Sequence, residues 1–365
     1  MNYETLSYFL AANSGEGFFS LFNTLYNAHE GWKLYIIKGG PGTGKSGMMK
    51  KIKLNAIERG FACHCVYCSS DPDSLDAVII PELKISVCDG TSPHTVDPVY
   101  PGVSETIINL GECWDENKLE ESKNHIITLT DCNKALHKRS SKYLFAAAKA
   151  KTENEKILAS CVNQQKIENY ALRSIIKNYE CTNKAGTAKS IFLNGNTPKG
   201  KYIFIDTINA LCDKIITVTD EYNHTSSMLI ESIGNIATAN GADVIMCLDP
   251  LRPSSKPLHI IIPDLRTGYF TTDSRINLKP YATKNINASR FIEKDKFNVY
   301  KNRLLFNQKA ATRFEDEAID IMKKAKSVHD ELEKHYIKAM DFNKLNDISD
   351  KMIQKIFSSS QLTKE

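Results

Sequence analysis

The chain has 365 residues, of which 42% are hydrophobic and 25% are charged, and its formal net charge is +4. This length allows two ordinary domains, and the composition is normal for a globular protein and excludes a largely disordered chain. The small net charge does not by itself argue for nucleic-acid binding. No apolar run approaches the length of a membrane span, and the N-terminus lacks the features of a signal peptide, so we expect a cytoplasmic protein.

The first predicted elements surround a glycine-rich segment. Residues 34–37 are apolar and indicate a buried strand, whereas residues 46–59 carry apolar side chains at helical spacing and are followed by Gly60, a common helix stop. Between them, residues 39–46 match G-x-x-x-x-G-K-[ST], the phosphate-binding loop called Walker A. Strand, glycine loop and helix is the arrangement that this motif requires.

The residues of the loop have separate expected tasks. Glycines let the backbone wrap around phosphate oxygens, and successive N–H groups form an anion-binding nest at a helix N-terminus. Lys45 would contact the β- and γ-phosphates as a catalytic residue, and Ser46 would bind Mg²⁺ through its hydroxyl. We therefore expect ATP and Mg²⁺ as cofactors, with the nucleotide bound by Gly39, Gly40, Pro41, Gly42, Thr43, Gly44, Lys45, Ser46 and Gly47.

Further strands are predicted near residues 62–67 and 84–88, with a loop and short helix at residues 69–76 between them. Strands that alternate with helices predict an α/β fold with a doubly wound parallel sheet, in which ligands bind beyond the carboxyl ends of the strands. Asp71 and Asp89 lie at such ends. We assign Asp89 to the metal and Asp71 to substrate or water, as catalytic candidates; a helix cap or a turn is the alternative for either aspartate.

Two more groups could carry chemistry. His94 lies in a proline-rich loop just past Asp89 and could reach the triphosphate, although ordinary loop packing is the simpler interpretation. The cluster of Cys63, Cys65 and Cys68 could suggest zinc, but no second ligand pair follows at a zinc-finger spacing. We therefore expect free, partly buried thiols, which behave as small core residues.

The two halves of the chain match each other with few gaps. Gly17 pairs with Gly200 at an offset of 183 (200 − 17), and residues 78–83 pair with residues 260–265 at an offset of 182 (260 − 78). The offset drifts by only a residue or two over a domain-sized distance. This pattern indicates a tandem duplication and excludes a solenoid of short repeats.

The second copy of the loop has lost the phosphate-binding pattern. At an offset of 181 (226 − 45), Ser226 replaces Lys45. Ser227 keeps the hydroxyl, which is the one functional side chain of the loop that remains. Asp220 and Glu221 stand where phosphate would bind, and their charges would repel it. We expect the second half to keep the fold and to have lost triphosphate binding; a cationic or neutral ligand on these two carboxylates, or a solvated loop, are the alternatives.

Long charged helical segments close each half. Residues 104–179 and 288–357 contain few helix breakers. We therefore expect two P-loop NTPase-like parallel sheets, each with a helical appendage. A polar stretch at residues 182–187 marks the joint, which gives one domain at residues 1–185 and a second at residues 186–365.

The chain resembles a known family in several segments, at residues 39–46, 68–76, 79–83, 89–98, 100–102 and 107–112. This family comprises duplicated P-loop ATPase-like proteins of spore-forming and related Gram-positive bacteria. The resemblance covers essentially the whole chain and implies ATP binding without a substrate. The family commonly keeps a Walker loop in the second half as well, and this chain departs from it there.

The leading hypothesis is a Mg²⁺-dependent ATP-binding protein, a slow ATPase with one nucleotide site in the first half and a degenerate regulatory or structural second half. One alternative is a small-molecule or nucleotide kinase with Asp71 as its base. Another is a non-enzymatic, nucleotide-dependent switch or scaffold. The lysines of the helical appendages make nucleic acid a candidate partner, beside an unidentified small molecule or protein, and no membrane partner is expected. The absence of an Asn-Lys-x-Asp guanine signature favours ATP over GTP.

Overall fold

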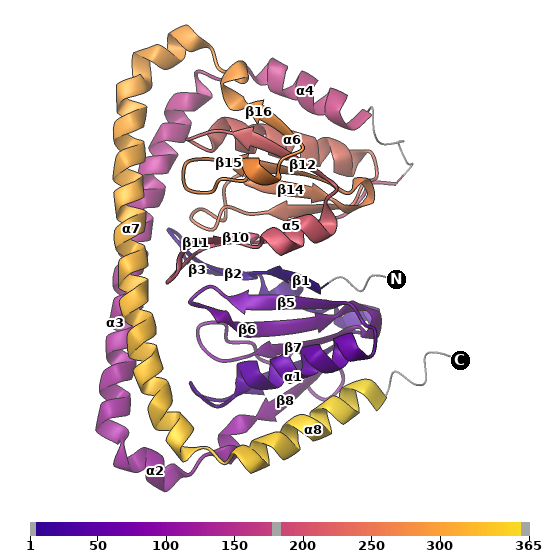
Figure 1. Cartoon of the computed structure of the whole chain (residues 1–365), viewed down its shortest axis with the longest axis vertical. Helices are drawn as coiled ribbons and strands as arrows, with labels where there is room; N and C mark the ends of the chain where they lie inside the picture. Colours follow the sequence, from indigo (N-terminus) through magenta and orange to yellow (C-terminus); the bar gives the residue numbers. More distant parts are fainter. Residues whose placement is uncertain (1–4, 177–183, 359–365) are drawn as a thin grey trace. The chain divides into compact units, whose positions relative to one another are not determined.

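The computed structural model describes residues 5–176 and 184–358. The chain forms two compact units (Figure 1). Unit 1 contains the described residues of the segments 1–11, 20–139 and 321–365, and unit 2 contains those of the segments 12–19 and 140–320. The predicted boundary between residues 185 and 186 therefore falls inside unit 2. Over the described part of the chain, no helix has the length and apolar character needed to cross a membrane.

A six-stranded mixed sheet forms the centre of unit 1. Its strands are β1 (Thr5–Tyr8), β4 (Lys33–Lys38), β5 (Cys63–Cys68), β6 (Asp71–Ile80), β7 (Ile85–Asp89) and β8 (Glu105–Asn109). They are ordered β1-β5-β6-β7-β4-β8, and β6 runs antiparallel to both of its neighbours while all other pairs are parallel.

The sheet of unit 2 repeats this arrangement. Its strands are β9 (Ala188–Ile191), β12 (Lys214–Thr219), β13 (Val244–Cys247), β14 (His259–Ile262), β15 (Thr267–Thr272) and β16 (Lys284–Asn287). They are ordered β9-β13-β14-β15-β12-β16, and β14 is the antiparallel strand. Two further two-stranded sheets pair β2 (Ala11–Ser14) with β3 (Gly17–Ser20) and β10 (Asn194–Thr197) with β11 (Gly200–Ile203).

The backbone repeats in the same way as the sheets, which confirms the predicted duplication. Gly17 and Gly200 both have a positive φ, of 96° and 103°. Lys84 and Arg266, at an offset of 182 (266 − 84), have φ values of 53° and 43°, a conformation that side-chain-bearing residues seldom adopt. Two uncommon backbone conformations at matching positions indicate that both halves follow one chain path.

The prediction of parallel sheets was wrong at β6. The sequence indicated a loop and short helix at residues 69–76, because Ser69, Ser70, Asp71 and Pro72 are turn and cap residues. Instead, β5 and β6 are joined by only two residues, which forces an antiparallel pair, since a parallel crossover needs a dozen residues or more. Register shifts near Tyr67 and Cys68 accommodate Pro72, which cannot donate a hydrogen bond to the ladder.

Helices complete both units. They are α1 (Lys45–Glu58), α2 (Glu116–Glu121), α3 (Lys123–Ala159), α4 (Gln164–Ile176), α5 (Ile205–Leu211), α6 (His224–Ala239), α7 (Lys294–Ala339) and α8 (Phe342–Ser358). Several elements lie where the sequence predicted them: the strand, loop and helix around the Walker pattern, and the strands β5 and β7. The long helical segments were also predicted, except that residues 105–109 form the edge strand β8. Residues 177–179 of the first segment and 182–183 of the predicted joint lie outside the described residues.

The short helix that ends each half packs on the core of the other half's sheet. Helix α8 follows α7 in the second half, yet its buried side chains join α1 in the core of unit 1, through Ile353, Ile356, Phe357, Met49 and Ile52. Helix α4 follows α3 in the first half, and its Ile167, Ala171 and Ile175 join α6 in the core of unit 2. Each fully buried large aliphatic side chain contributes about 1.5–3 kcal/mol, so neither core is complete without the exchanged helix.

Candidate functional site

The Walker segment connects the end of β4 to the start of α1 in unit 1. Gly42 and Gly44 have φ values of +67° and +82°, which explains why glycine occupies these positions. Thr43 is buried, and its hydroxyl donates a hydrogen bond to the Gly40 carbonyl at 2.9 Å, which closes the turn. The backbone therefore has the tight, left-handed turns that let N–H groups converge in anion-binding loops.

Lys45, the first residue of α1, extends back over the loop. Its ammonium donates hydrogen bonds to the carbonyls of Gly39 at 2.9 Å and Gly40 at 2.7 Å. Its Nζ also lies 3.6 Å from Oδ2 of Asp89, and the two side chains are only 12% and 16% exposed. The positive charge is thus held at the mouth of the loop, beside a carboxylate.

Asp89 lies where the sequence predicted a metal-binding carboxylate. Strand β7 pairs with β4, and Asp89 is directly opposite Ile37, one residue before the end of β4. Its Oδ1 accepts hydrogen bonds from the Thr91 N–H at 2.8 Å and the Thr91 hydroxyl at 2.6 Å. These bonds fix the carboxylate and leave Oδ2 toward Lys45.

Ser46 lies next to Lys45 in the first turn of α1. Its hydroxyl oxygen accepts a hydrogen bond from the Leu75 N–H at 3.0 Å, which joins the loop to β6. A serine hydroxyl has two acceptor positions and one proton, so one lone pair remains available for a cation.

Asp71 is placed differently from the prediction. It is the first residue of β6 and does not precede a helix. Its Oδ2 accepts a hydrogen bond from the Ser74 hydroxyl at 2.8 Å and lies 3.5 Å from Nζ of Lys326 on α7. Burial opposes the charge of Lys326, but Asp330 and Asp71 outweigh it and raise the pKa of this lysine above its ordinary value. Asp71 therefore pairs with α7 rather than with Lys45.

His94 is also turned away from the predicted role. Its ring stacks on Phe22, with centroids 4.3 Å apart, and its Nε2 lies 2.9 Å from a carboxylate oxygen of Asp76. Both His94 and Asp76 are buried. Loop packing, the simpler of the two sequence interpretations, is what the structure shows.

The last turns of α7 cover the loop. The Gly42 N–H donates a hydrogen bond to Oε1 of Glu333 at 3.2 Å. A Cβ atom added at Gly42 would lie 2.8 Å from the Glu333 carbonyl oxygen, and one added at Gly40 would lie 3.1 Å from the ring of Tyr336. The Glu333 carboxylate is thus an anion bound to a loop amide.

These covering residues were missed by the sequence analysis. Glu333, Tyr336 and Lys326 lie almost 300 residues after the loop in the chain, and Trp114 lies about 70 residues after it. The helical pattern of residues 288–357 predicted a packed helix, but no local pattern showed which surface that helix would cover.

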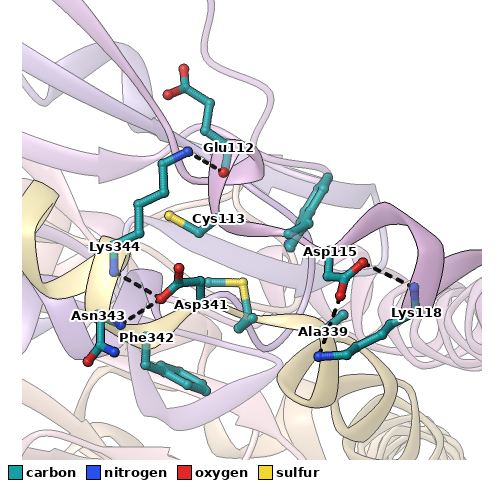
Figure 2. A pocket seen from close by; sticks show the side chains of 11 residues that line it. Glu112, Cys113, Asp115, Lys118, Ala339, Asp341, Phe342, Asn343 and Lys344 are labelled. Carbon is teal, nitrogen blue, oxygen red and sulfur yellow. Dashed lines mark hydrogen bonds and ion pairs between the residues drawn. The ribbon is translucent and has the colours of Figure 1, made fainter.

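A polar cavity of 610 Å³ borders the covered loop (Figure 2). Its lining residue Trp114 lies 3.2 Å from the position of a Cβ added at Gly40. Asp115 and Asp341 in its wall accept hydrogen bonds from the first N–H groups of α2 and α8, so each caps a helix. Lys344 donates a hydrogen bond to the Glu112 carbonyl at 2.6 Å. These polar groups hold the wall together.

In the second half, the loop that corresponds to the Walker segment is filled by the carboxylate of its own residue Asp220. Asp220 is 7% exposed, and its two oxygens accept hydrogen bonds from the N–H groups of Tyr222 at 3.0 Å and Ser226 at 2.9 Å. Burial raises the pKa of Asp220, although the donated hydrogen bonds counteract this effect. The solvated-loop alternative was therefore wrong for Asp220, because both of its oxygens accept hydrogen bonds within the turn. Glu221, by contrast, is exposed.

Residue Asn223 takes the position of Gly42 in this second loop, at an offset of 181 (223 − 42). Its φ is +61° against +67° for the glycine, and asparagine tolerates this conformation better than most residues. The backbone turn is thus retained where the side chains of the Walker pattern are absent.

Comparison of the chain with known protein families, curated protein sequences and solved structures gave no match. The resemblance noted from the motifs therefore stays a prediction.

Proposed function

We propose that the first half of this protein binds ATP with Mg²⁺ at residues 39–47 and hydrolyses it slowly. The observation that carries the proposal is the position of Lys45, which lies over a Walker-pattern loop and 3.6 Å from Asp89. An anion-binding turn, a cation and a carboxylate at the end of the neighbouring strand are the parts that phosphoryl transfer needs, because its catalysis depends on positioning and charge stabilisation.

Each residue has one task in this proposal. The loop N–H groups and the Lys45 ammonium bind the phosphates, and the Ser46 hydroxyl and the Asp89 carboxylate would hold Mg²⁺. The metal would neutralise charge on the phosphate oxygens when bound. Thr91 orients Asp89 through its two hydrogen bonds. The second half, whose loop is occupied by Asp220, would contribute structure rather than a second nucleotide site.

Hydrolysis is favoured over the kinase alternative by the surroundings of Asp71. A general base must lie within hydrogen-bond reach of the hydroxyl it deprotonates. The Asp71 carboxylate pairs with Lys326 of α7 and accepts from Ser74. This position suits a residue that holds α7 near the loop better than one that activates a substrate.

Nucleotide titration of the full-length protein tests the proposal. Labelled ATP with Mg²⁺ should bind with a stoichiometry of one per chain. Lys45→Ala should weaken binding at least tenfold, whereas Lys50→Ala, on the exposed side of α1, should bind like the parent. Asp89→Asn should keep the nucleotide site and lose Mg²⁺-dependent phosphate release.

Three results would contradict the proposal: a parent protein that ignores nucleotides, equal affinities for the parent and Lys45→Ala, or two equal sites per chain. Phosphate transfer to a nucleoside or metabolite in a panel of acceptors, with little release to water, would instead support the kinase alternative.

A further inference from the structure

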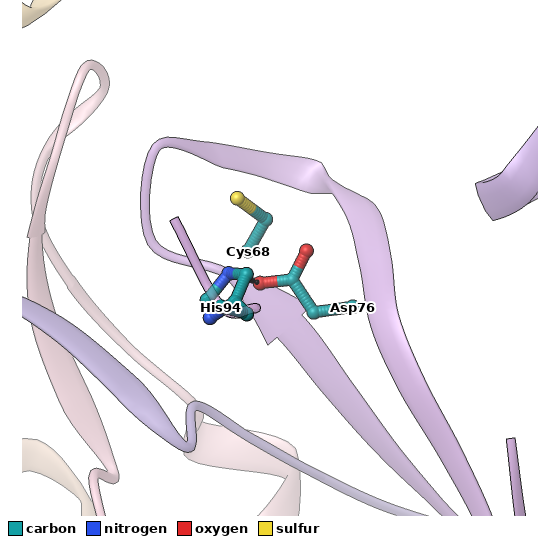
Figure 3. Close-up of side chains that lie close together, drawn as sticks. All are labelled: Cys68, Asp76 and His94. Carbon is teal, nitrogen blue, oxygen red and sulfur yellow. Dashed lines mark ion pairs between the residues drawn. The ribbon is translucent and has the colours of Figure 1, made fainter. Parts of the chain in front are cut away.

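A thiol, a carboxylate and an imidazole gather in unit 1, outside the residues assigned to nucleotide binding (Figure 3). Cys68 ends β5, Asp76 lies within β6, and His94 belongs to the loop that follows β7. One ligand atom from each side chain lies within 4.8 Å of those of the other two. Asp76 and His94 are only 5% and 7% exposed.

The surroundings hold these side chains in place. The His94 ring is packed against Phe22 and lies 2.9 Å from the Asp76 carboxylate through Nε2. The loop that carries His94 is fixed by Lys38, whose ammonium donates hydrogen bonds to the carbonyls of Gly90 and Val96, both at 2.8 Å. Ligands on strands and a fixed loop give a more precise site than ligands on mobile segments.

The buried Asp76 carboxylate has its ion-pair partner within the cluster. Among the described residues, no lysine or arginine forms an ion pair with Asp76; its partner is His94. A buried carboxylate beside an imidazole and a thiol is a ligand set that a divalent cation can bind.

We propose that Cys68, Asp76 and His94 bind a zinc-class divalent cation. Sulfur, nitrogen and oxygen ligands together are typical of Zn²⁺, and three protein ligands leave the fourth tetrahedral position to water. Bonds of about 2.0–2.3 Å at tetrahedral angles place ligand atoms roughly 3.5 Å apart. Separations in the cluster, which reach at most 4.8 Å, would therefore contract by up to about 1.3 Å, and the 2.9 Å between His94 Nε2 and Asp76 would widen on binding. Cys68 loses its proton to solvent on binding, and thiolate, carboxylate and dication sum to zero charge.

The site has a structural consequence for the Walker loop. It ties β5 and β6, whose first residue is Asp71, to the loop that follows Asp89. Both candidate carboxylates would therefore be positioned by one cation. The second half lacks the site, because Leu258 takes the place of Asp76 at an offset of 182 (258 − 76).

Cobalt titration of the metal-free full-length protein tests this proposal. One equivalent of Co²⁺ should give the visible absorption of a tetrahedral site together with a sulfur-to-cobalt charge-transfer band in the near ultraviolet. Cys68→Ser should lose the charge-transfer band, and His94→Asn should weaken Co²⁺ binding at least tenfold. Cys132→Ser, at an exposed cysteine, and His29→Gln, at an exposed histidine, should both behave like the parent.

If the variants do not fold, Co²⁺ titration of the parent protein alone still tests the proposal. A charge-transfer band that saturates at one equivalent, and that zinc abolishes by competition, supports the site. A parent that shows no such band, or a folded Cys68→Ser variant that keeps it, overturns the proposal. Because nucleotide is absent from this assay, its result is independent of the proposed ATP site.

Discussion

Glu333 of α7 accepts a hydrogen bond from the Gly42 N–H, with 3.2 Å between Oε1 and the nitrogen. The carboxylate thus occupies part of the loop that the Walker pattern reserves for phosphate. Tyr336 lies over Gly40 and Leu345 of α8 over Gly44, where an added Cβ would lie 2.6 Å from its Cδ2. The proposed nucleotide binding would therefore require Glu333 and the last turns of α7 to move off the loop.

Glu333→Ala should strengthen nucleotide binding about three- to tenfold, because hydrogen bonds to charged groups are worth about 1.5–3 kcal/mol and this one is partly exposed to solvent. Titration of the full-length variant with labelled ATP measures the change. Glu331→Ala is the matched control, since Glu331 is exposed on the same helix and pairs with Lys334. Unchanged or weaker ATP binding by Glu333→Ala would show that the carboxylate does not compete with phosphate.

Removal of the carboxylate that fills the second loop should destabilise the protein. Asp220→Ala leaves the N–H groups of Tyr222 and Ser226 without their acceptor, and buried unsatisfied donors cost about 1–3 kcal/mol each. Urea unfolding measures the difference. The neighbouring Glu221→Ala should change stability by less than about 0.5 kcal/mol, because its side chain is exposed. Equal stability of the two variants would refute the role assigned to Asp220.

A buried carboxylate in unit 2 should be essential for stability. Glu315 is 1% exposed and lies 3.2 Å from Lys151, 2.5 Å from Lys201 and 3.7 Å from Arg275. Loss of its charge leaves these buried cations without a counter-charge, so Glu315→Gln should destabilise the chain by about 3–5 kcal/mol. The adjacent Asp316→Asn is the control, because its carboxylate is 56% exposed and should contribute at most about 1 kcal/mol. A small effect at Glu315 in thermal unfolding would contradict the prediction.

Acid should weaken unit 2 through His259. Burial lowers the pKa of this histidine from 6.5 to about 4, although Asp273 and Asp249 partly oppose the shift. Between these pH values the unfolded chain binds a proton that the folded chain does not, so stability falls as pH decreases from about 6.5 to 4, by up to roughly 3 kcal/mol. Urea midpoints between pH 7 and 4.5 measure this slope. His259→Phe should flatten it and His29→Gln should not; an equal slope in all three proteins would exclude His259 as the cause.

The sequence predicted the parts of the site that depend on local pattern. The loop with the Walker pattern, the flanking strand and helix, and Asp89 at the end of a neighbouring strand lie where residue spacing placed them. The duplication showed that the second copy lacks the pattern. Strand β6 was missed because Ser69, Ser70, Asp71 and Pro72 have strong turn and cap preferences. Only pairing on both sides, with β5 and β7, makes this segment a central strand.

Contacts between distant segments could not be predicted. An amphipathic helix shows that one face is buried but does not show against what, so neither α4 nor α8 could be assigned to the opposite core. The hydrogen bond between Glu333 and Gly42 spans 291 residues. Cys68, Asp76 and His94 likewise come from three segments, and they do not follow a zinc-finger spacing in the sequence.

The exchange of α4 and α8 between the two cores has a consequence for how such a chain could arise. A half-length ancestor with the same chain path would lack a cover for its own α/β core. In a dimer of such chains, the terminal helix of each chain could cover the core of the other, as in domain-swapped dimers. Fusion of two such chains would keep the exchange within a single polypeptide, so that each sheet retains its covering helix even where the two copies have diverged in sequence.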